Sequence, residues 1–350
     1  MKPHQWEIFK QAARRQFPGT MPVALIIDSP WIPGYFGITH LRYYLDAELW
    51  FKSNLALAEE FPDIIFLPSW WVEYGMAIEP SALGCRITFL PDQPPSLSPV
   101  LRRPGEVEDL SPVNPYTDGL MALALERYRM HKQRILDSGH TLPLVAARGP
   151  LCLAAFLRGL SNFMVDIMES PAATHKLLTF ATDAVIRWLQ AQAEVIGDSV
   201  EGMLVLDDIP GLLSRNTYLE FAHPYLKQIC SAFPSEWIKV YHNDANIRPF
   251  LSELPETGFH VLNWTHNIDV AEALSKTGGK ICLMGNVAPL DTGVRGSPDQ
   301  VRYTALEVLR KTGGRNCILS LGGGVSPGMP KANIAALARA ARDFPLSGGF

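Results

Sequence analysis

The sequence is poor in cysteine, has no long apolar run and has no basic run, and each absence excludes a class of protein. Its five cysteines are scattered over 350 residues without a Cys-x-x-Cys pair, so neither a disulfide framework nor a zinc ribbon is expected. No apolar run reaches the ~18–20 residues of a membrane-spanning helix, and residues 1–17 are amphipathic and charged, unlike a signal peptide. The net charge of −4 and the lack of a Lys and Arg cluster argue against nucleic acid. We therefore expect a cytoplasmic protein that binds neither nucleic acid nor a membrane.

Short apolar runs alternate with segments of helical periodicity along most of the chain. The runs predict eight strands, over residues 23–28, 64–67, 144–147, 203–206, 238–242, 261–264, 281–284 and 317–321. The periodic segments predict helices over 46–60, 120–136, 172–196, 217–232, 270–276, 298–311 and 331–342. This alternation predicts an α/β fold, a closed (β/α)8 TIM barrel. An open doubly wound sheet is the alternative, but no G-x-G-x-x-G turn follows the first strand.

Two segments fall outside this alternation. Residues 1–20 predict an N-terminal helical extension, and the proline-rich residues 85–115, with a strand-like 86–90, predict an inserted hairpin or flap near the barrel mouth. No internal repeat and no domain linker interrupts the pattern. We therefore expect residues 1–350 to form a single barrel domain.

The predicted strand ends carry polar residues, and in a (β/α)8 barrel the chemistry lies at the C-terminal ends of the strands. His242 and Asp244 end the fifth strand, and a His-x-Asp spacing on extended backbone points both side chains the same way. We predict them as catalytic residues and as metal ligands. Asp207 and Asp208, after the fourth strand, are two further catalytic candidates, although Asp before Ile209-Pro210 also suits a turn or a helix N-cap.

The other strand ends supply candidates for substrate binding. Aromatic residues on the first two exit loops favour an apolar or planar ligand, and packing of these loops over the barrel end is the alternative interpretation. The candidates are Asp28, Trp31, Tyr35, Trp70, Trp71, Glu73, Arg148, Trp264, Asn286 and Gly323.

From about residue 144 onward, several motifs occur in a recognisable order. They are Arg148-Gly149-Pro150, Leu157-Arg158-Gly159, Asp207-Asp208, His242-Asn243-Asp244, Met284-Gly285-Asn286 and Gly322-Gly323-Gly324. In this order and spacing the chain resembles the uroporphyrinogen decarboxylase superfamily. The resemblance implies a (β/α)8 barrel with its pocket at the mouth.

The motifs resemble the corrinoid-dependent methyltransferase branch of that superfamily, of the O-demethylase type, more than its true decarboxylases. Decarboxylases of the family carry Arg-Gln-Ala-Gly-Arg-Tyr after the first strand, whereas residues 28–34 here contain no arginine to pair substrate carboxylates. Family members that act on thiols bind zinc through a His-x-Cys pair and a later Cys. Those two cysteine positions are Asp244 and Gly323 in this chain.

The resemblance therefore implies an enzyme that moves a methyl group from a small methoxylated, aromatic donor to the cobalt of a corrinoid (cobalamin), which a separate corrinoid-binding protein carries. His242 and Asp244 would assist the leaving oxygen, either directly or through zinc. Two alternatives stay open: a decarboxylase of a cyclic carboxylic acid related to uroporphyrinogen decarboxylase, and a non-catalytic ligand-binding barrel. A homodimer is left open as well.

Overall fold

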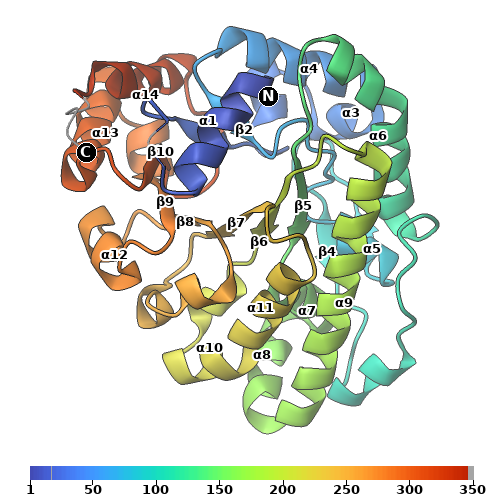
Figure 1. Cartoon of the computed structure of the whole chain (residues 1–350). Helices are drawn as coiled ribbons and strands as arrows, with labels where there is room; N and C mark the ends of the chain where they lie inside the picture. Colours follow the sequence, from blue (N-terminus) through green and yellow to red (C-terminus); the bar gives the residue numbers. More distant parts are fainter. Residues whose placement is uncertain (17, 346–350) are drawn as a thin grey trace.

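A ring of eight parallel strands forms the centre of the computed structural model, which describes residues 1–16 and 18–345 (Figure 1). The strands are β1 (Ala24–Ile26), β2 (Ile65–Leu67), β5 (Leu144–Arg148), β6 (Gly202–Leu206), β7 (Ile238–Asn243), β8 (Val261–Trp264), β9 (Cys282–Val287) and β10 (Cys317–Leu321). Strands β5 to β10 pair in order, β1 pairs with β2, and a bridge between Val23 and Leu319 joins β1 to β10. Between β2 and β5 no backbone pairing occurs in the described chain, so the ring has one open seam there. Each of the eight predicted strands is found, and the predicted barrel is confirmed.

Helices surround this ring (Figure 1). They are α1 (Pro3–Ala13), α2 (Ile32–Phe36), α3 (His40–Leu45), α4 (Ala47–Glu60), α5 (Ile78–Ala82), α6 (Gly119–Asp137), α7 (Pro150–Arg158), α8 (Leu160–Glu169), α9 (Pro171–Ile196), α10 (Arg215–Phe221), α11 (His223–Ser231), α12 (Val270–Thr277), α13 (Pro298–Thr312) and α14 (Lys331–Asp343). Six of the seven predicted helices end within one residue of the observed bounds. The helix predicted over 217–232 is wrong: it is two helices, because Pro224 lacks an amide N–H and cannot continue α10.

No single helix within the described ranges is long and apolar enough to cross a membrane. Helices α7 and α8 reach that length and hydropathy only when taken together, across a bend of 104°.

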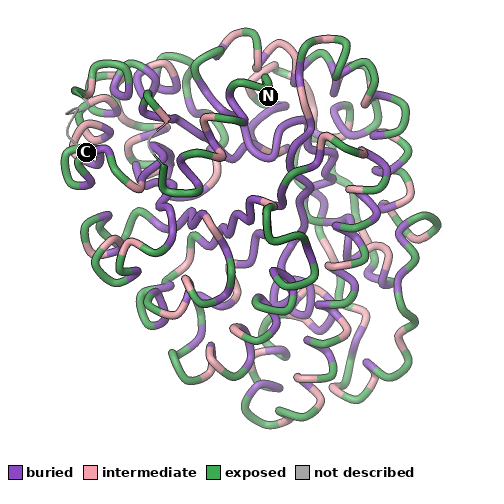
Figure 2. Tube along the Cα trace, in the orientation of Figure 1, coloured by how far each residue is buried: buried purple, intermediate pink, exposed green. Residues whose placement is uncertain are grey.

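Two hydrophobic cores lie on the two sides of the strands, and the strands themselves are buried along the centre of the molecule (Figure 2). Alternate residues such as Leu144, Ala146, Leu204 and Leu206 fill the inside of the barrel, while the residues between them pack against the helices. Because side chains alternate along a strand, the next inward positions after these aliphatic layers carry polar groups. The two-residue alternation of side chains thus places polar groups at the C-terminal end of the barrel interior.

Helix α1 covers the opposite, N-terminal end of the barrel. Trp6 and Phe9 belong to the same hydrophobic cluster as the barrel interior. The Trp6 indole Nε1 donates to Glu201 Oε2 at 2.7 Å, and Lys10 Nζ lies 2.6 Å from the same oxygen, just before β6 begins. The predicted N-terminal helix therefore closes one end of the barrel, and the C-terminal ends of the strands form the open mouth.

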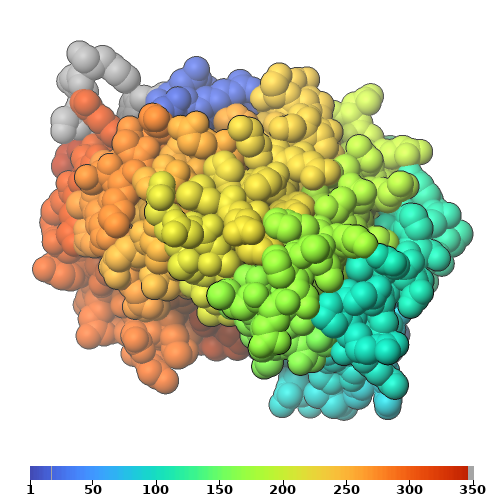
Figure 3. All heavy atoms as spheres, turned by 90° about the horizontal axis from the view of Figure 1, so that it is seen from below, coloured from blue at the N-terminus to red at the C-terminus, as the bar shows by residue number. Residues whose placement is uncertain are grey.

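The predicted hairpin is present, formed by antiparallel β3 (Arg86–Thr88) and β4 (Ser96–Ser98). Its far side joins α7, because the Val100 and Leu101 amides both donate to the carbonyl of Leu157. Its turn reaches the start of α3, where the Leu41 amide donates to the carbonyl of Pro91. In the view from below, the cyan segment that follows the hairpin projects at one edge, beside the green surface of α7 and α8 (Figure 3).

Candidate functional site

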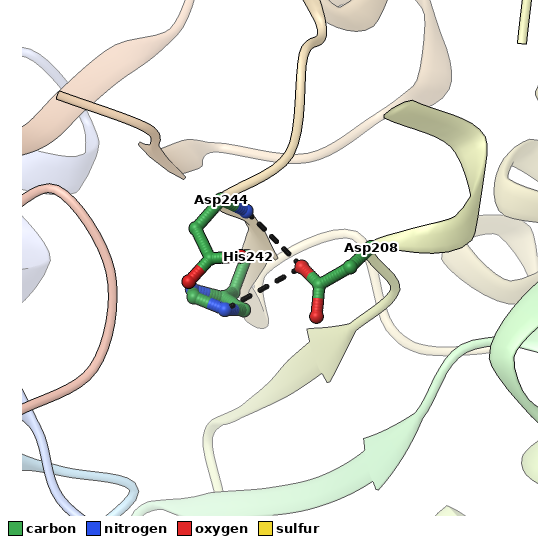
Figure 4. A group of neighbouring side chains, drawn as sticks. All are labelled: Asp208, His242 and Asp244. Carbon is green, nitrogen blue, oxygen red and sulfur yellow. Dashed lines mark hydrogen bonds and ion pairs between the residues drawn. The ribbon is translucent and has the colours of Figure 1, made fainter. Parts of the chain in front are cut away.

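Three side chains from two neighbouring strand ends converge at the mouth: Asp208, His242 and Asp244 (Figure 4). One ligand atom from each lies within 4.8 Å of the others. His242 Nε2 is 3.6 Å from Asp208 Oδ1, and the Asp244 amide donates to the same oxygen at 3.1 Å. His242 is buried, Asp208 is half-buried and Asp244 is exposed at the rim, so the group opens toward the mouth. We call these three residues the Asp-His-Asp cluster.

Asn263 on β8 fixes the proton of the His242 ring. Its Nδ2 donates to the carbonyls of Met284 and Leu321, at 2.7 and 2.9 Å, so its Oδ1 must be the atom 2.7 Å from His242 Nδ1. An amide oxygen only accepts, and therefore Nδ1 carries the hydrogen. In the neutral ring the lone pair is consequently on Nε2, the nitrogen that faces the Asp-His-Asp cluster.

The Asp-His-Asp cluster thus directs three electron-pair donors at one point. Neutral imidazole and two carboxylates repel one another at these distances unless a positive charge lies among them. A proton on Nε2 supplies that charge, as does a bound cation. One imidazole and two carboxylates form a donor set that suits zinc, with room for a further ligand from the open side. The residues present therefore fit a metal, and Asp208, His242 and Asp244 would hold it.

The glycine triplet after β10 lets other loops approach this cluster. A Cβ on Gly323 would lie 3.0 Å from Asp244 Oδ2, and Gly323 has a φ of +140°, which favours glycine. A Cβ on Gly322 would meet the backbone of His266 at 2.5 Å. Burial of its carboxyl group raises the pKa of Asp244, and the negative charge of Asp208 raises it further. The predicted candidate Gly323 thus lies against the cluster.

Asp207, predicted as catalytic, points away from the cluster and caps a helix. Its two carboxylate oxygens accept from the amides of Leu151 (3.1 Å) and Cys152 (2.8 Å), in the first turn of α7. A Cβ on Gly149 would lie 2.3 Å from Asp207, so only glycine allows this approach. Burial raises the pKa of Asp207 to about 7. Asp207 therefore caps α7, which follows β5, and not the short helix that follows it in the chain, whereas Asp208 belongs to the cluster. The predicted catalytic role of Asp207 stays a prediction.

A second polar group lies in the mouth beside β5. Glu73 accepts from the amides of Ser29 and Gly75, at 2.7 and 2.6 Å, and Glu79 Oε1 accepts from the Arg148 amide at 2.8 Å. Burial, and then the charge of Glu73, raise the pKa of Asp28 to about 7, while Arg148 opposes them. The Arg148 Cζ lies 5.3 Å from the centroid of the Trp71 ring. Four predicted substrate-binding residues, Asp28, Trp71, Glu73 and Arg148, are therefore neighbours.

Three of the remaining aromatic candidates, Trp31, Trp70 and Trp264, pack in the core, which corrects their predicted role in substrate binding, whereas Tyr35 is half-buried against it. Trp31, Trp70 and Trp264 are at most 2% exposed and belong to the outer hydrophobic core. Tyr35 donates its hydroxyl to Glu60 Oε2 at 2.7 Å. For Trp31 and Trp70 the alternative of loop packing is correct, and Trp264, the last residue of β8, faces the surrounding helices.

Asn286 is buried and ties down the loop after β8. Its Nδ2 donates to the Ile268 carbonyl at 2.7 Å and to the Thr265 carbonyl at 3.5 Å. Its amide is thus used within the protein, and its predicted substrate contact stays a prediction.

The sequence-based selection missed two residues, Asn263 and Glu79. Asn263 is fully buried on β8, two residues after the inward-facing Val261. The one sign of Asn263 in the sequence was a single amide side chain within an otherwise apolar strand. Glu79 lies on a short helix that no periodicity marks, so its contact with Arg148 had no signal in the sequence.

Comparison with known proteins places the chain among relatives of one family. The family model described as uroporphyrinogen decarboxylase (URO-D) matches residues 9–344. Among named relatives, uroporphyrinogen decarboxylase of Chlorobaculum tepidum is 26% identical over 271 residues, 73% of this chain and 74% of that protein. The enzyme of the same name from Chloroherpeton thalassium is 26% identical over 287 residues, 79% of each chain.

Solved structures share the fold. A methyltransferase from Methanosarcina mazei superposes with a TM-score of 0.83 at 22% identity, covering 97% of this chain and 98% of that one. A B12-independent methionine synthase from Shewanella superposes with a TM-score of 0.55 at 11% identity, covering 92% and 98%. At these identities the similarity concerns the architecture of the barrel.

Proposed function

The chain belongs to the uroporphyrinogen decarboxylase family, and on that premise we propose that it is a methyltransferase of the O-demethylase type. The reaction would move a methyl group from a methoxylated aromatic donor to the cobalt of a corrinoid carried by a separate protein. The solved methyltransferase of Methanosarcina mazei, which has the same architecture, is consistent with this chemistry.

The observation that carries this proposal is the convergence of Asp208, His242 and Asp244 within 4.8 Å at the mouth. An aryl methyl ether is hard to cleave because a phenolate is a poor leaving group. A positive charge or a proton at the ether oxygen lowers that barrier. The cluster is built to hold such a charge where a ligand can reach it.

Each residue of the site would have a separate role in the methyl transfer. His242, with its Nδ1 proton fixed by Asn263, presents Nε2 to the substrate oxygen. Asp208 and Asp244 stabilise the positive charge beside it, whether that charge is the imidazolium proton or zinc. Zinc, when bound, would supply Lewis acidity at the ether oxygen. Trp71, inside the barrel near the mouth, offers an aromatic surface for the ring of the donor.

The distribution of arginine argues against a porphyrinogen as substrate. Within the eight parallel strands Arg148 is the only arginine, and the loop after β1 has none. Eight substrate carboxylates in a buried pocket would lack partners, which is costly.

The direct test is methyl transfer by the purified protein. Methoxybenzenes that carry a deuterated methyl group would be incubated with the protein and a reduced corrinoid protein, and the phenol product measured. Asp244→Asn is the matched variant, because it keeps the size of the side chain and removes its charge. We expect phenol from the wild type and at least about 100-fold less from the variant. Absence of phenol from every methoxylated donor would refute the proposal.

The names of the decarboxylase relatives motivate one competing outcome. The same preparation would be tested for carbon dioxide release from a panel of cyclic carboxylic acids. Release of carbon dioxide without phenol formation would favour a decarboxylase. Ligand binding without either product, unchanged in an Asp244→Asn variant, would favour a non-catalytic barrel.

A further inference from the structure

Asn243 is a fully buried amide at the end of β7, between the two cluster members His242 and Asp244. Successive side chains of a strand alternate, so Asn243 shares its face with Tyr241, which belongs to the outer hydrophobic core. An amide in such apolar surroundings is costly unless its donors and its acceptor are bonded. The partners of Asn243 therefore explain why an amide is found here.

Both ends of the Asn243 amide are bonded, and each end holds a different loop of the mouth. Its Nδ2 donates at 2.7 Å to the backbone carbonyl of Asp207, the residue directly before Asp208. Its Oδ1 accepts at 3.0 Å from the backbone amide of Ala245, the residue directly after Asp244. One side chain thus joins the backbone next to both carboxylates of the Asp-His-Asp cluster.

The two loops touch where Asn243 joins them. A Cβ on Gly211, in the loop after β6, would lie 2.4 Å from the Cβ of Ala245, so glycine is needed for this approach. Across the same contact the Asp244 amide donates to Asp208 Oδ1 at 3.1 Å. The separation of the two carboxylates therefore depends on backbone positions that Asn243 fixes.

Tyr241 bonds to the same carbonyl as Asn243 without joining the two loops. Its hydroxyl donates to the Asp207 carbonyl at 3.0 Å and accepts from Asn243 Nδ2 at 3.3 Å. The tyrosine ring is fully buried and stacks on Phe259, with 5.0 Å between the ring centroids. Tyr241 thus shares the structural surroundings of Asn243 but not its bond to the loop that carries Asp244.

We propose that Asn243 is a positioning residue, which sets the spacing at which Asp208 and Asp244 bind a divalent cation together with His242. The inference rests on the proposed function in one respect, because it concerns the form of that function in which zinc assists the leaving oxygen. Ligands held at a fixed spacing bind a cation more tightly, since less conformational freedom is lost on binding. Asn243 acts on the cation through the backbone of the two loops.

The test is a zinc titration of the purified protein in competition with a chromophoric chelator. Asn243→Leu keeps the size of the side chain and removes both bonds, and Asn243→Ser is too short to reach the Asp207 carbonyl. We expect zinc affinity to fall by about 10- to 100-fold in both variants. Tyr241→Phe is the matched control, because it removes the other donor to the same carbonyl. It should lower the stability to urea and leave zinc affinity unchanged.

A double-mutant cycle separates positioning from support of the fold. Asn243→Leu would be repeated in an Asp208→Asn background, in which the spacing of the two carboxylates no longer matters. The loss of zinc affinity caused by Asn243→Leu should then shrink to less than about threefold, because both changes act on one spacing. An effect on the fold as a whole would instead multiply with the loss caused by Asp208→Asn.

Four results would overturn the inference: unchanged zinc affinity in both Asn243 variants, an equal loss in Tyr241→Phe, losses that multiply in the double variant, or no zinc binding by the wild type. Methyl transfer by the wild type, with zinc binding that does not depend on Asn243, would refute this inference alone. Zinc binding that depends on Asn243, without methyl transfer from any methoxylated donor, would refute the proposed function alone.

Discussion

At the scale of single residues, the position of one hydrogen decides the chemistry of His242. Asn263 Oδ1 accepts from Nδ1 because the amide nitrogen of Asn263 is already engaged with two backbone carbonyls. The ring nitrogen that faces Asp208 and Asp244 is left as a base. A residue that orients a histidine in this way sets the basicity of the imidazole and its affinity for a metal ion.

Asn263→Leu should release this constraint. We expect the His242 ring to populate both neutral forms, and zinc affinity to fall by about 10- to 100-fold. The ¹⁵N chemical shifts of the two imidazole nitrogens report the form directly, and a zinc titration gives the affinity. Asn263→Asp keeps an acceptor opposite Nδ1 and should restore the single ring form, while the loss of the N–H donors to the Met284 and Leu321 carbonyls lowers stability. Unchanged ring shifts in the leucine variant would show that Asn263 has no influence on the proton.

Asp28 predicts a pH dependence of stability. Burial holds its pKa near 7 in the folded state, above the ordinary value of 3.8, so the folded state binds the proton more tightly than the unfolded state. Its stabilising contribution is complete below pH 4 and is lost as the pH rises to 7. The free energy of unfolding, measured by urea denaturation at pH 5 and pH 8, should therefore fall less in Asp28→Asn than in the wild type. Asn at the exposed Asp183 is the control, and an identical fall in Asp28→Asn would contradict the account.

At the scale of elements, the end of β6 and the start of α7 are one unit. Asp207 accepts from two amides of the first turn of α7, and Gly149 leaves room for it. The adjacent Asp208 turns to the other side of the strand, into the mouth. Two consecutive aspartates thus have opposite roles, because the chain leaves β6 after Leu206 and turns at Asp208 into the short helix over Ile209–Leu212.

Asp207→Ala should destabilise the protein by about 1–3 kcal/mol, since it removes the cap of α7 and leaves two buried amides unpaired. Zinc affinity should stay within a few-fold of the wild type. Asp208→Asn should show the converse, with little change in stability and a large loss of zinc binding. Chemical denaturation and zinc titration of the two variants measure both effects, and loss of zinc binding in Asp207→Ala would restore a role for it in the cluster.

The sequence predicted the barrel elements well and the orientation of exit-loop residues poorly. Hydrophobic periodicity is a local property, so the eight strands and most helices follow from it. The burial of Trp31, Trp70 and Trp264 depends on how loops fold back onto helices, which no periodicity records. Helix α7 was missed for a related reason, because it is buried on almost every side and shows no apolar stripe.

The residues of the site were predictable only in part, because local periodicity does not record which distant residues meet. The His-x-Asp spacing reveals that two side chains share a face. Only the pairing of β7 with β6 and β8 brings Asp208 and Asn263 to His242.

At the scale of the whole molecule, the barrel is closed at one end and open at the other. Helix α1 covers the N-terminal end through Trp6 and its contact with Glu201, and the polar residues gather at the C-terminal end. Around that mouth Arg148 and His242 lie at the ends of β5 and β7, and Trp71 and Asp208 lie in the loops that follow β2 and β6. With the proposed function, the leaving oxygen of the donor lies at the Asp-His-Asp cluster on this mouth.

The most direct test of this claim is a double-mutant cycle on the rate of methyl transfer. The rate would be measured for the wild type, Asp208→Asn, His242→Gln and the double variant, with the methoxylated donor that supports turnover. If the side chains act as one unit on the leaving oxygen, each single variant should be at least about 100-fold slower, and the double variant only a few-fold slower than the worse single one. Single variants that keep the wild-type rate, or losses that multiply in the double variant, would contradict the account.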